Sequence, residues 1–368
     1  MIEQLNSLSI KAKVGQLFTI GIAGPTIDDE TRRLLDEISP GGVCLFARNI
    51  RDIGQTRELL DEIMATLLVL PLLSVDQEGG LVDRLRRVLA PMPAASKIKN
   101  VQDVRLHAEI TGDTLRMLGF NMDLAPVVDV IDAERGKYTN GLFSRTFGDS
   151  KESVVELASE FLRVLQSKGI VGCLKHFPGL GASRVDSHEE LPSVDIPGPE
   201  LDSVDQFPYK QLLKAGNVEA VMVAHAAFPG HRLQETGQNG KLLPSSLSKN
   251  FITTLLRGEL GFDGLVITDD MEMGAIIKNY GMGDACKMAI KAGVDQLAIC
   301  AGAENIREGF HAVLSAVNSG EIVVERIDQA ITRIERVKKR LSQPTRFDPD
   351  RLAKISSDIT VFANRINS

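Results

Sequence analysis

Residues 265–274 read LVITDDMEMG, a short apolar run followed by two carboxylates. Apolar runs without polar alternation are typical of strands that are buried on both faces, as in a parallel sheet. Seven more runs of this kind recur along the chain. The eight runs cover residues 16–23, 42–46, 72–75, 122–130, 170–174, 220–224, 265–268 and 296–300. The sequence therefore predicts eight buried strands.

Helical patterns separate these runs. Apolar residues at helical spacing, or clear start and stop signals, mark residues 28–38, 55–68, 153–167, 248–260, 285–292 and 306–317. Ser248 is a candidate N-cap for the fourth of these helices. One strand–helix unit occupies on average about 46 residues, and this alternation predicts βαβ units around a parallel sheet.

Polar residues gather where the predicted strands end. In a closed barrel such side chains converge on one mouth, whereas in an open sheet they are spread along an edge. They are Asp76, Asp129, Lys175, His176, His225, Asp269 and Asp270. No G-x-G-x-x-G motif follows an early strand, which disfavours a dinucleotide-binding sheet. We therefore predict an α/β fold of the (β/α)8 TIM-barrel type.

The whole length is expected to form one domain. A charged helix over residues 323–341 follows the eighth unit and can pack on the outside of the barrel. The residues after it are too few for a second domain. We predict a barrel with its extra C-terminal helix over residues 1–342 and a short tail over residues 343–368.

Composition narrows the class of partner and the compartment. The formal net charge is −7, and no apolar run approaches the length of a membrane span, so we expect no nucleic-acid and no membrane partner. The four cysteines lie in apolar segments without C-x-x-C spacing and are expected to be reduced and buried. The N-terminus has no secretory pattern. We expect a cytoplasmic protein that needs no metal and no other cofactor.

Residues 175–188, KHFPGLGASRVDSH, carry the clearest candidate site. Lys175 and His176 stand where a predicted strand ends. Asp186 and His188 are two residues apart, so they project to the same side of an extended loop. The aspartate would fix the tautomer of the imidazole and favour its protonated form, which makes a proton donor. The alternative is a solvated loop in which the pair occurs by chance.

Asp269 and Asp270 directly follow an apolar strand. If one of these neighbours points into the mouth, the other faces elsewhere, because side chains alternate along a strand. A carboxylate in this place can be a nucleophile towards an anomeric carbon, a metal ligand or a helix cap. The capping role suits Asp270 better than Asp269.

Two more segments place charged side chains near the mouth. Residues 74–84, SVDQEGGLVDR, put a cluster of acids that includes Asp76 at a strand end. Carboxylates there can accept hydrogen bonds from sugar hydroxyls or cap the following turn. Arg145 lies in the loop sequence SRTFG, residues 144–148, where a lone arginine is usually solvated.

These segments resemble family 3 of the glycoside hydrolases, in particular its short, single-barrel β-N-acetylhexosaminidases. The resemblance runs from VGQLFTIGI, which begins at Val14, to VDQLAIC, which ends at Cys300. Between them it includes, in the family's order, GGVCLFARNI, VDQEGG, NMDLAPVVDV, SRTFG, KHFPG, DSH, VMVAH and LRGELGFDGLVITDDMEMGAI. The resemblance implies a retaining exo-β-N-acetylglucosaminidase that acts on small glycans or muropeptides.

The resemblance also implies a role for individual residues. Asp269 matches the catalytic nucleophile, His188 the general acid/base and Asp186 its partner in a dyad. The positions that hold the sugar match Asp76, Arg84, Arg145, Lys175 and His176. In the implied mechanism Asp269 attacks C1 while His188 protonates the leaving oxygen and later deprotonates water.

The chain departs from the family pattern at two positions. Leu180 stands where the family commonly has the second histidine of K-H-F-P-G-H-G, and Leu81 stands where it commonly has arginine after E-G-G. Three other activities stay open beside the hydrolase. They are a β-N-acetylglucosaminide phosphorylase, a β-glucosidase or β-xylosidase of the same family, and a sugar-binding protein without turnover.

Overall fold

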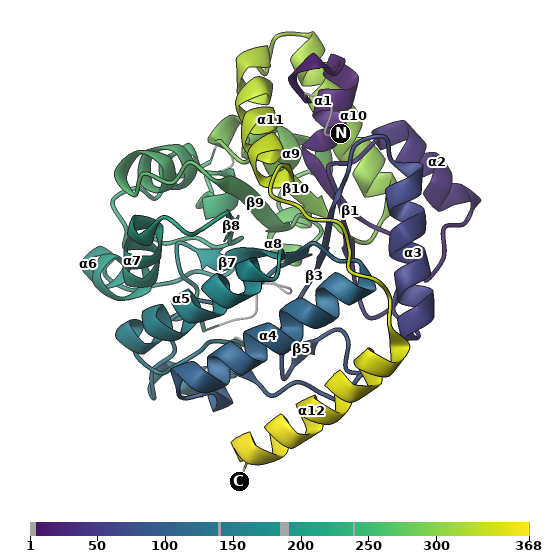
Figure 1. Ribbon diagram of the computed structural model, residues 1–368. Coiled ribbons are helices and arrows are strands. Elements are labelled where there is room, and N and C mark those ends of the chain that lie inside the picture. Colours follow the sequence, from purple (N-terminus) through teal and green to yellow (C-terminus); the bar gives the residue numbers. More distant parts are fainter. Residues whose placement is uncertain (1–4, 139–140, 185–190, 238–239, 368) are drawn as a thin grey trace.

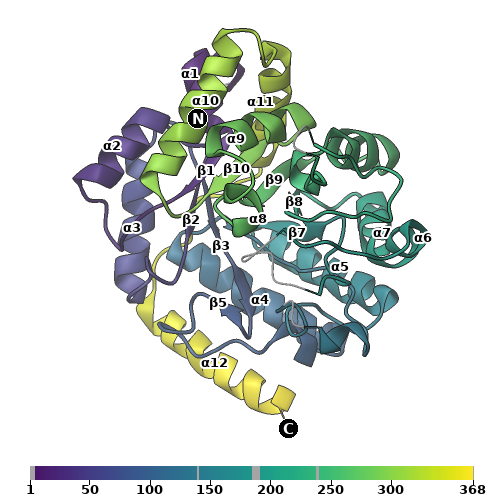
Figure 2. The same cartoon turned by 180° about the vertical axis from the view of Figure 1, so that it is seen from behind.

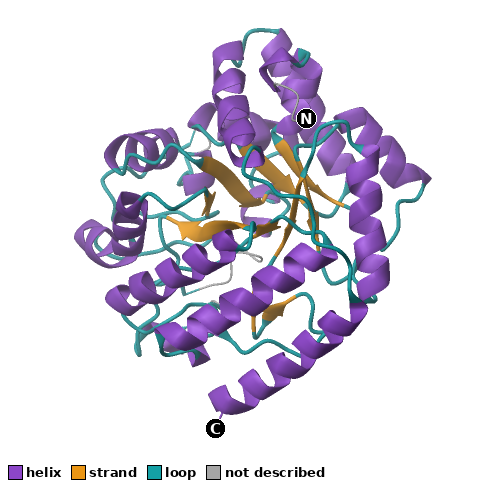
Figure 3. Cartoon of the chain, in the orientation of Figure 1, coloured by secondary structure: helices purple, strands orange, loops and turns teal. Residues whose placement is uncertain are grey.

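Eight parallel strands close into a barrel in the order β1-β10-β9-β8-β7-β6-β3-β2, and helices surround them (Figures 1 and 3). The computed structural model describes residues 5–138, 141–184, 191–237 and 240–367. The predicted (β/α)8 fold is confirmed, and each predicted run contains a strand. The barrel strands are β1 (Phe18–Gly21), β2 (Gly42–Leu45), β3 (Leu72–Val75), β6 (Met122–Asp123), β7 (Val171–Phe177), β8 (Ala220–Val223), β9 (Leu265–Asp270) and β10 (Gln296–Ile299).

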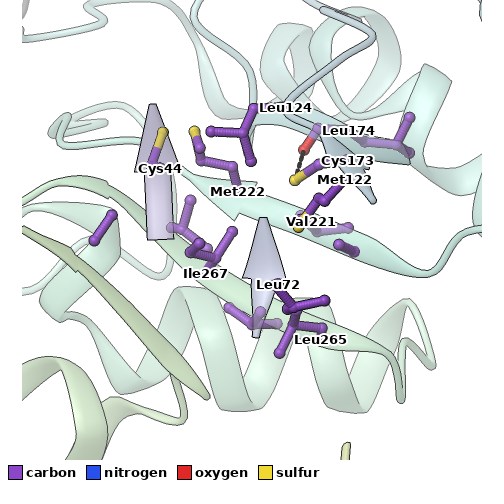
Figure 4. Packing of buried hydrophobic residues seen from close by; sticks show 14 of the residues in the cluster. Cys44, Leu72, Met122, Leu124, Cys173, Leu174, Val221, Met222, Leu265 and Ile267 are labelled. Atoms are coloured by element: carbon purple, nitrogen blue, oxygen red, sulfur yellow. Dashed lines mark hydrogen bonds between the residues drawn. The ribbon is translucent and has the colours of Figure 1, made fainter. Parts of the chain in front are cut away.

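The strands are mostly apolar because both of their faces are covered. Their outer face packs under the helices, and their inner face fills the barrel. Figure 4 shows Cys44 of β2, Met222 of β8 and Ile267 of β9 close together inside the barrel. The last two residues of β9 are partly exposed, and this strand end carries the two neighbouring aspartates.

Thirteen helices of the described chain lie around the barrel or at its ends (Figures 1 and 2). They are α1 (Ile10–Gln16), α2 (Asp29–Ile38), α3 (Ile53–Thr66), α4 (Val101–Leu118), α5 (Lys151–Ser167), α6 (Gly198–Glu200), α7 (Phe207–Ala215), η6 (Asn250–Glu259), α8 (Gly274–Ile277), α9 (Met282–Ala292), α10 (Ala303–Asn318), α11 (Val324–Lys338) and α12 (Pro349–Asn367). Shorter helical turns are η1 (Leu5–Ser7), η2 (Ala95–Lys97), η3 (Arg135–Lys137), η4 (Leu201–Asp205) and η5 (Ser245–Leu247). Among the described residues, no helix has the length and apolar character needed to cross a membrane.

Local capping chemistry sets where these helices begin. Asp28, Asp52 and Asn100 each accept a hydrogen bond from the backbone N–H three residues further on, at the start of α2, α3 and α4. Ser248, the predicted N-cap, lies just before η6, and its hydroxyl accepts a hydrogen bond from the N–H of Phe251 at 3.3 Å.

A small hairpin interrupts the barrel pattern after β3. Its strands are β4 (Gln77–Gly79) and β5 (Val82–Asp83). The turn requires glycine, because Gly79 and Gly80 have φ of 88° and 60°. A Cβ on Gly79 would lie 2.3 Å from the carbonyl oxygen of Pro93, and one on Gly80 would lie 2.6 Å from Ala94. The turn is therefore packed tightly against the following loop.

The segment expected to be a tail contains α12, which lies alongside α4 at the edge of the molecule (Figures 1 and 2). Phe362 of α12 is 1% exposed, and its ring contacts His107 of α4 with centroids 6.5 Å apart. Ser356 accepts a hydrogen bond from the N–H of Ala90 at 2.8 Å. Helix α12 thus covers both α4 and the loop that follows the β4–β5 hairpin.

We predict that Phe362→Ala lowers the free energy of unfolding by about 3–5 kcal/mol, because it leaves a cavity under α12. Urea denaturation measures this change. Val361→Ala is the matched control, since Val361 is 67% exposed, and it should change the stability by about 0.5 kcal/mol or less. Equal effects of the two substitutions would contradict the view that α12 is part of the folded core.

Candidate active site

A cavity of about 240 Å³ opens at the C-terminal end of the barrel strands. This is the end at which the polar residues were predicted to meet, and it is where barrel enzymes keep their active sites. The cavity lining includes six predicted site residues: Asp76, Arg84, Arg145, Lys175, His176 and Asp269. The other two, Asp186 and His188, lie outside the described residues.

A network of buried charges forms one wall of the cavity. Nζ of Lys175, on β7, lies 2.7 Å from Oδ1 of Asp76 and 2.6 Å from Oε1 of Glu78. The guanidinium of Arg145 binds both carboxylate oxygens of Glu78, at 2.8 and 2.9 Å. Arg84 approaches the second oxygen of Asp76 at 3.4 Å. The network joins β7, the end of β3, the β4–β5 hairpin and the loop that carries Arg145.

The two carboxylates of this network stay ionised. Burial alone would raise the pKa of Glu78, but Arg145 and Lys175 lower it to about 2. For Asp76, too, burial is outweighed by Lys175 and Arg84, so its pKa lies below the ordinary value. The reverse holds for Lys175: burial would lower its pKa, but the two carboxylates raise it. Each charge therefore keeps its partner charged.

Two cavity residues keep hydrogen-bonding groups available for a ligand. Among the described residues, Nε of Arg84 is buried without a hydrogen-bond partner, although a buried N–H group normally has one. Nδ1 of His176 lies 2.8 Å from Oδ2 of Asp129, which leaves Nε2 as the ring nitrogen for a ligand. Asp129 in turn accepts a hydrogen bond from the N–H of Leu180 at 2.6 Å.

The two neighbouring aspartates at the end of β9 have different environments. Burial would raise the pKa of Asp269, but the nearby His176 and a 2.8 Å hydrogen bond from the N–H of Asp270 hold the pKa below its ordinary value. Burial raises the pKa of Asp270 to about 7, and the charges of Glu272 and Asp269 add to this effect. Asp269 is therefore the ionised carboxylate of the pair, and opposite pKa shifts of this kind separate acid from base roles.

Asp270 also behaves as a local cap. Its Oδ1 accepts hydrogen bonds from the N–H groups of Glu272 and Cys300, at 3.1 and 3.3 Å. The capping interpretation thus fits Asp270, which fixes the chain that leaves β9 against the end of β10.

His225, one of the polar residues at the predicted strand ends, supports the cavity from behind. It is fully buried, and it does not line the cavity. Its ring nitrogens lie 2.7 Å from the hydroxyl of Ser246 and 3.1 Å from the carbonyl oxygen of Asp270. Burial lowers the pKa of His225, so the ring holds the end of β9 as a neutral group.

Two residues that hold the site together, Glu78 and Asp129, were not among the predicted site residues. Glu78 is two residues from Asp76, and this spacing could have indicated that both reach the same cation. Asp129 was noted at a strand end, but its pairing with His176 spans 47 residues and has no local signal. Among the described residues, no group of three or more His, Cys, Asp or Glu is arranged to hold a metal ion.

An ionised carboxylate at the end of a barrel strand, beside a small cavity lined by arginine, lysine and aspartate, is suited to bind a sugar and attack its anomeric carbon. The fold and the site are those of a barrel glycosidase. Comparison with known proteins supports this class of protein. The sequence matches the Glycosyl hydrolase family 3 N terminal domain over residues 9–337.

Known proteins with similar sequences and structures point to the same family. The chain is 32% identical over 304 residues to a beta-hexosaminidase of Tolumonas auensis, covering 82% of this chain and 86% of that protein. It is 33% identical over 288 residues to a beta-hexosaminidase of Pseudomonas aeruginosa, covering 76% of this chain and 81% of that protein. A family 3 beta-N-acetylglucosaminidase from Paenibacillus superposes with a TM-score of 0.86 and 35% identity, over 97% of this chain and 69% of that chain. The chain belongs to glycoside hydrolase family 3 and is a glycosidase.

The raised pKa of Asp270 predicts a pH-dependent effect of Asp270→Asn. Ionising Asp270 costs the folded state more than the unfolded state, so the penalty is absent below pH 4, grows as the pH rises and is complete above about pH 7. The amide oxygen can still accept the two backbone hydrogen bonds. The variant should therefore raise the free energy of unfolding by about 2–4 kcal/mol at pH 8 and leave it nearly unchanged at pH 4.

Urea denaturation of the wild type and of Asp270→Asn at the two pH values measures this difference. The same change in stability at pH 4 and pH 8 would show that Asp270 titrates alike in the folded and unfolded chain.

Proposed function

We propose that the protein is a retaining exo-β-N-acetylglucosaminidase that uses Asp269 as its nucleophile. The observation that carries the proposal is the ionised carboxylate of Asp269 in the same cavity as the predicted sugar-binding residues. The choice of N-acetylglucosamine is supported by the similar proteins, which are named beta-hexosaminidase or beta-N-acetylglucosaminidase.

Each predicted binding residue has a part in holding the sugar in this proposal. Asp76 accepts hydrogen bonds from sugar hydroxyls while Lys175 and Arg84 hold its carboxylate in place. Arg84 and His176 offer Nε and Nε2 as further polar contacts. Arg145, fixed by Glu78, completes the charged wall. Binding by rigid, already paired groups costs little reorganisation when the substrate enters.

The proposed reaction has two steps. Asp269 attacks C1 of the sugar and forms a covalent glycosyl ester, while the leaving oxygen takes a proton from His188. His188, oriented by Asp186, then removes a proton from water, which attacks C1 and releases Asp269. An acid from outside the described cavity is consistent with the lowered pKa values of Asp76 and Asp269, which carry no proton at neutral pH. Asp270, whose pKa is raised to about 7, is the alternative acid within the cavity.

We place the reaction in the cytoplasm, on small glycans or muropeptides. All four cysteines are buried and free, which suits a reducing compartment. Cell fractionation with an antibody against the chain tests the placement, and recovery with the secreted fraction would refute it.

Asp269→Asn should lower kcat for 4-nitrophenyl N-acetyl-β-glucosaminide by about 10⁴-fold or more, because the amide cannot form the ester. Its thermal unfolding should stay close to that of the wild type. A fluorinated sugar that slows the second step should label Asp269, and peptide mass spectrometry locates the label. Label on Asp270, or activity near that of the wild type, would move the nucleophile away from Asp269.

His188→Ala should slow substrates with poor leaving groups by about 10²–10⁴-fold and activated aryl glycosides far less. Asp270→Asn is the control, because Asp270 is the cavity-lining carboxyl with a pKa near 7. Asp270→Asn should keep the leaving-group dependence of the wild type, and Asp186→Asn should move it towards that of His188→Ala. If Asp270→Asn alone shows the dependence expected of His188→Ala, Asp270 is the acid.

Two assays separate the remaining activities. In the first assay, the rates of cleavage of an aryl 2-acetamido-glucoside, glucoside and xyloside are compared under the same conditions. A preference for the glucoside or the xyloside would refute the choice of sugar. Product analysis in phosphate buffer distinguishes a hydrolase, which releases free sugar, from a phosphorylase, which releases the sugar phosphate.

A further inference from the structure

A buried histidine lies behind the charged wall of the cavity. His107, on α4, is fully buried, and among the described residues neither of its ring nitrogens has a hydrogen-bond partner. Burial lowers the pKa of His107 to about 4, although the nearby backbone of Pro93 and Glu78 favours the protonated form. The ring is therefore uncharged at neutral pH. A buried polar side chain usually has a partner, so the place of this one calls for an explanation.

His107 lies against the two segments that carry the ion pair between Glu78 and Arg145. On the side of the β4–β5 hairpin, a Cβ on Gly79 would lie 3.2 Å from Nε2 of His107, and Gly79 directly follows Glu78. On the other side, the ring of Phe147 packs edge-on against the imidazole, with centroids 6.0 Å apart. Phe147 is two residues after Arg145. Both halves of the ion pair thus rest on one side chain.

Two further aromatic rings enclose the imidazole. Phe161 of α5 lies 5.6 Å from it and Phe362 of α12 lies 6.5 Å from it, measured between ring centroids. Both phenylalanines are 1% exposed. Helix α12 is also tied to α4 by an ion pair between Arg365 and Asp103 at 2.5 Å. The imidazole is therefore held between the helices around the barrel and α12.

Helix α12 reaches the β4–β5 hairpin by a second route, through the loop that follows it. Ser356 of α12 accepts a hydrogen bond from the N–H of Ala90 at 2.8 Å. Two residues further on, the carbonyl oxygen of Met92 accepts a hydrogen bond from the N–H of Gly80 at 2.9 Å. The N–H of Met92 donates to the carboxylate of Asp83 at 2.8 Å. The loop that α12 holds is thus bound to both the tip and the base of the hairpin.

We propose that His107 is a positioning residue for sugar binding, and that α12 keeps it in place through Phe362. The imidazole fixes the distance between the segments of Glu78 and Arg145, and with it the shape of the charged wall. His107 does not line the described cavity, so it acts through the residues that do. The nucleophile Asp269 stands on β9, away from this contact. A displaced wall should therefore weaken sugar binding more than it slows the attack. The inference rests on the proposed function and adds the residues outside the cavity on which it depends.

The first test separates KM from kcat in Phe362→Ala, with 4-nitrophenyl N-acetyl-β-glucosaminide as substrate of the full chain. KM should rise about tenfold while kcat falls by about threefold at most, because the substitution lets the wall shift and leaves the nucleophile in place. A merely structural role has a different signature. Partial unfolding reduces the number of active molecules, which lowers the apparent kcat and leaves KM unchanged.

Phe310→Ala is the matched control. Phe310 of α10 is fully buried like Phe362, and its ring packs on Phe18 of β1 with centroids 5.9 Å apart, away from the residues that line the cavity. The control should lose a similar amount of stability and keep the KM of the wild type. An unchanged KM in Phe362→Ala, or an equal rise in Phe310→Ala, would overturn the inference.

His107→Leu and His107→Gln test the imidazole itself. Both new side chains are close in size to histidine, so both variants should fold. Leucine places methyl groups beside the backbone of Glu78 and Pro93, whereas glutamine keeps an N–H donor there. His107→Leu should raise KM about tenfold, and His107→Gln should stay within about threefold of the wild type. Equal KM values in the two variants would show that the imidazole does not position the wall.

Hydrogen exchange, followed by mass spectrometry on peptides that cover residues 77–92, tests the placement without any activity. Exchange in Phe362→Ala should be about tenfold faster than in the wild type, because the N–H groups of Gly80 and Met92 lose their fixed partners. It should change little in Phe310→Ala. Unchanged exchange in Phe362→Ala would contradict the link between α12 and the hairpin. If the wild type cleaves no N-acetyl-β-glucosaminide and exchange rises as expected, the proposed function fails while the link stands.

Discussion

The mouth of the barrel depends on the ion pairs that join Lys175 and Arg145 to Asp76 and Glu78. None of these charges could remain buried alone, because an unpaired ion loses several kcal/mol of hydration. Lys175 is the link, since it reaches both carboxylates from β7. Its pairs tie the end of β3, the β4–β5 hairpin and the loop of Arg145 to one strand. The geometry of the sugar cavity is therefore set by electrostatic pairing between segments that lie far apart in the sequence.

Asp269 and Asp270 are neighbours, but their surroundings shift their pKa values in opposite directions. Both belong to β9, yet the first faces His176 and the second faces Glu272 and the start of the chain after β10. The surroundings of Asp269 give it a positive potential, and the surroundings of Asp270 give it a negative potential. A strand end with two adjacent carboxylates can in this way keep one ionised for chemistry while the other fixes the backbone. His225, neutral and bound to the carbonyl oxygen of Asp270, holds the same strand end from behind.

The sequence predicted the barrel because its signal is local and repeated: an apolar run occurs eight times, and polar residues follow five of these runs. It also indicated which residues meet at the mouth, since strand ends in a barrel converge. Other features had no such signal. The pairing of His176 with Asp129, and of Lys175 with Glu78, depends on which strands become neighbours and on side-chain length. Helix α4 was not predicted, although Asn100 and Gly119 mark its ends, and α12 was treated as a tail because its apolar face, with Phe362, has meaning only against α4.

The tight turn of the β4–β5 hairpin has a consequence for how this protein can evolve. Gly79 and Gly80 have no room for a side chain, so the backbone of the hairpin tolerates little change. Leu81, the next residue, is 57% exposed, so its side chain contributes little to folding. A rigid frame thus presents one exposed side chain beside the charged wall of the cavity. Single substitutions at this position are therefore expected to leave the fold intact, even though the position lies at the cavity.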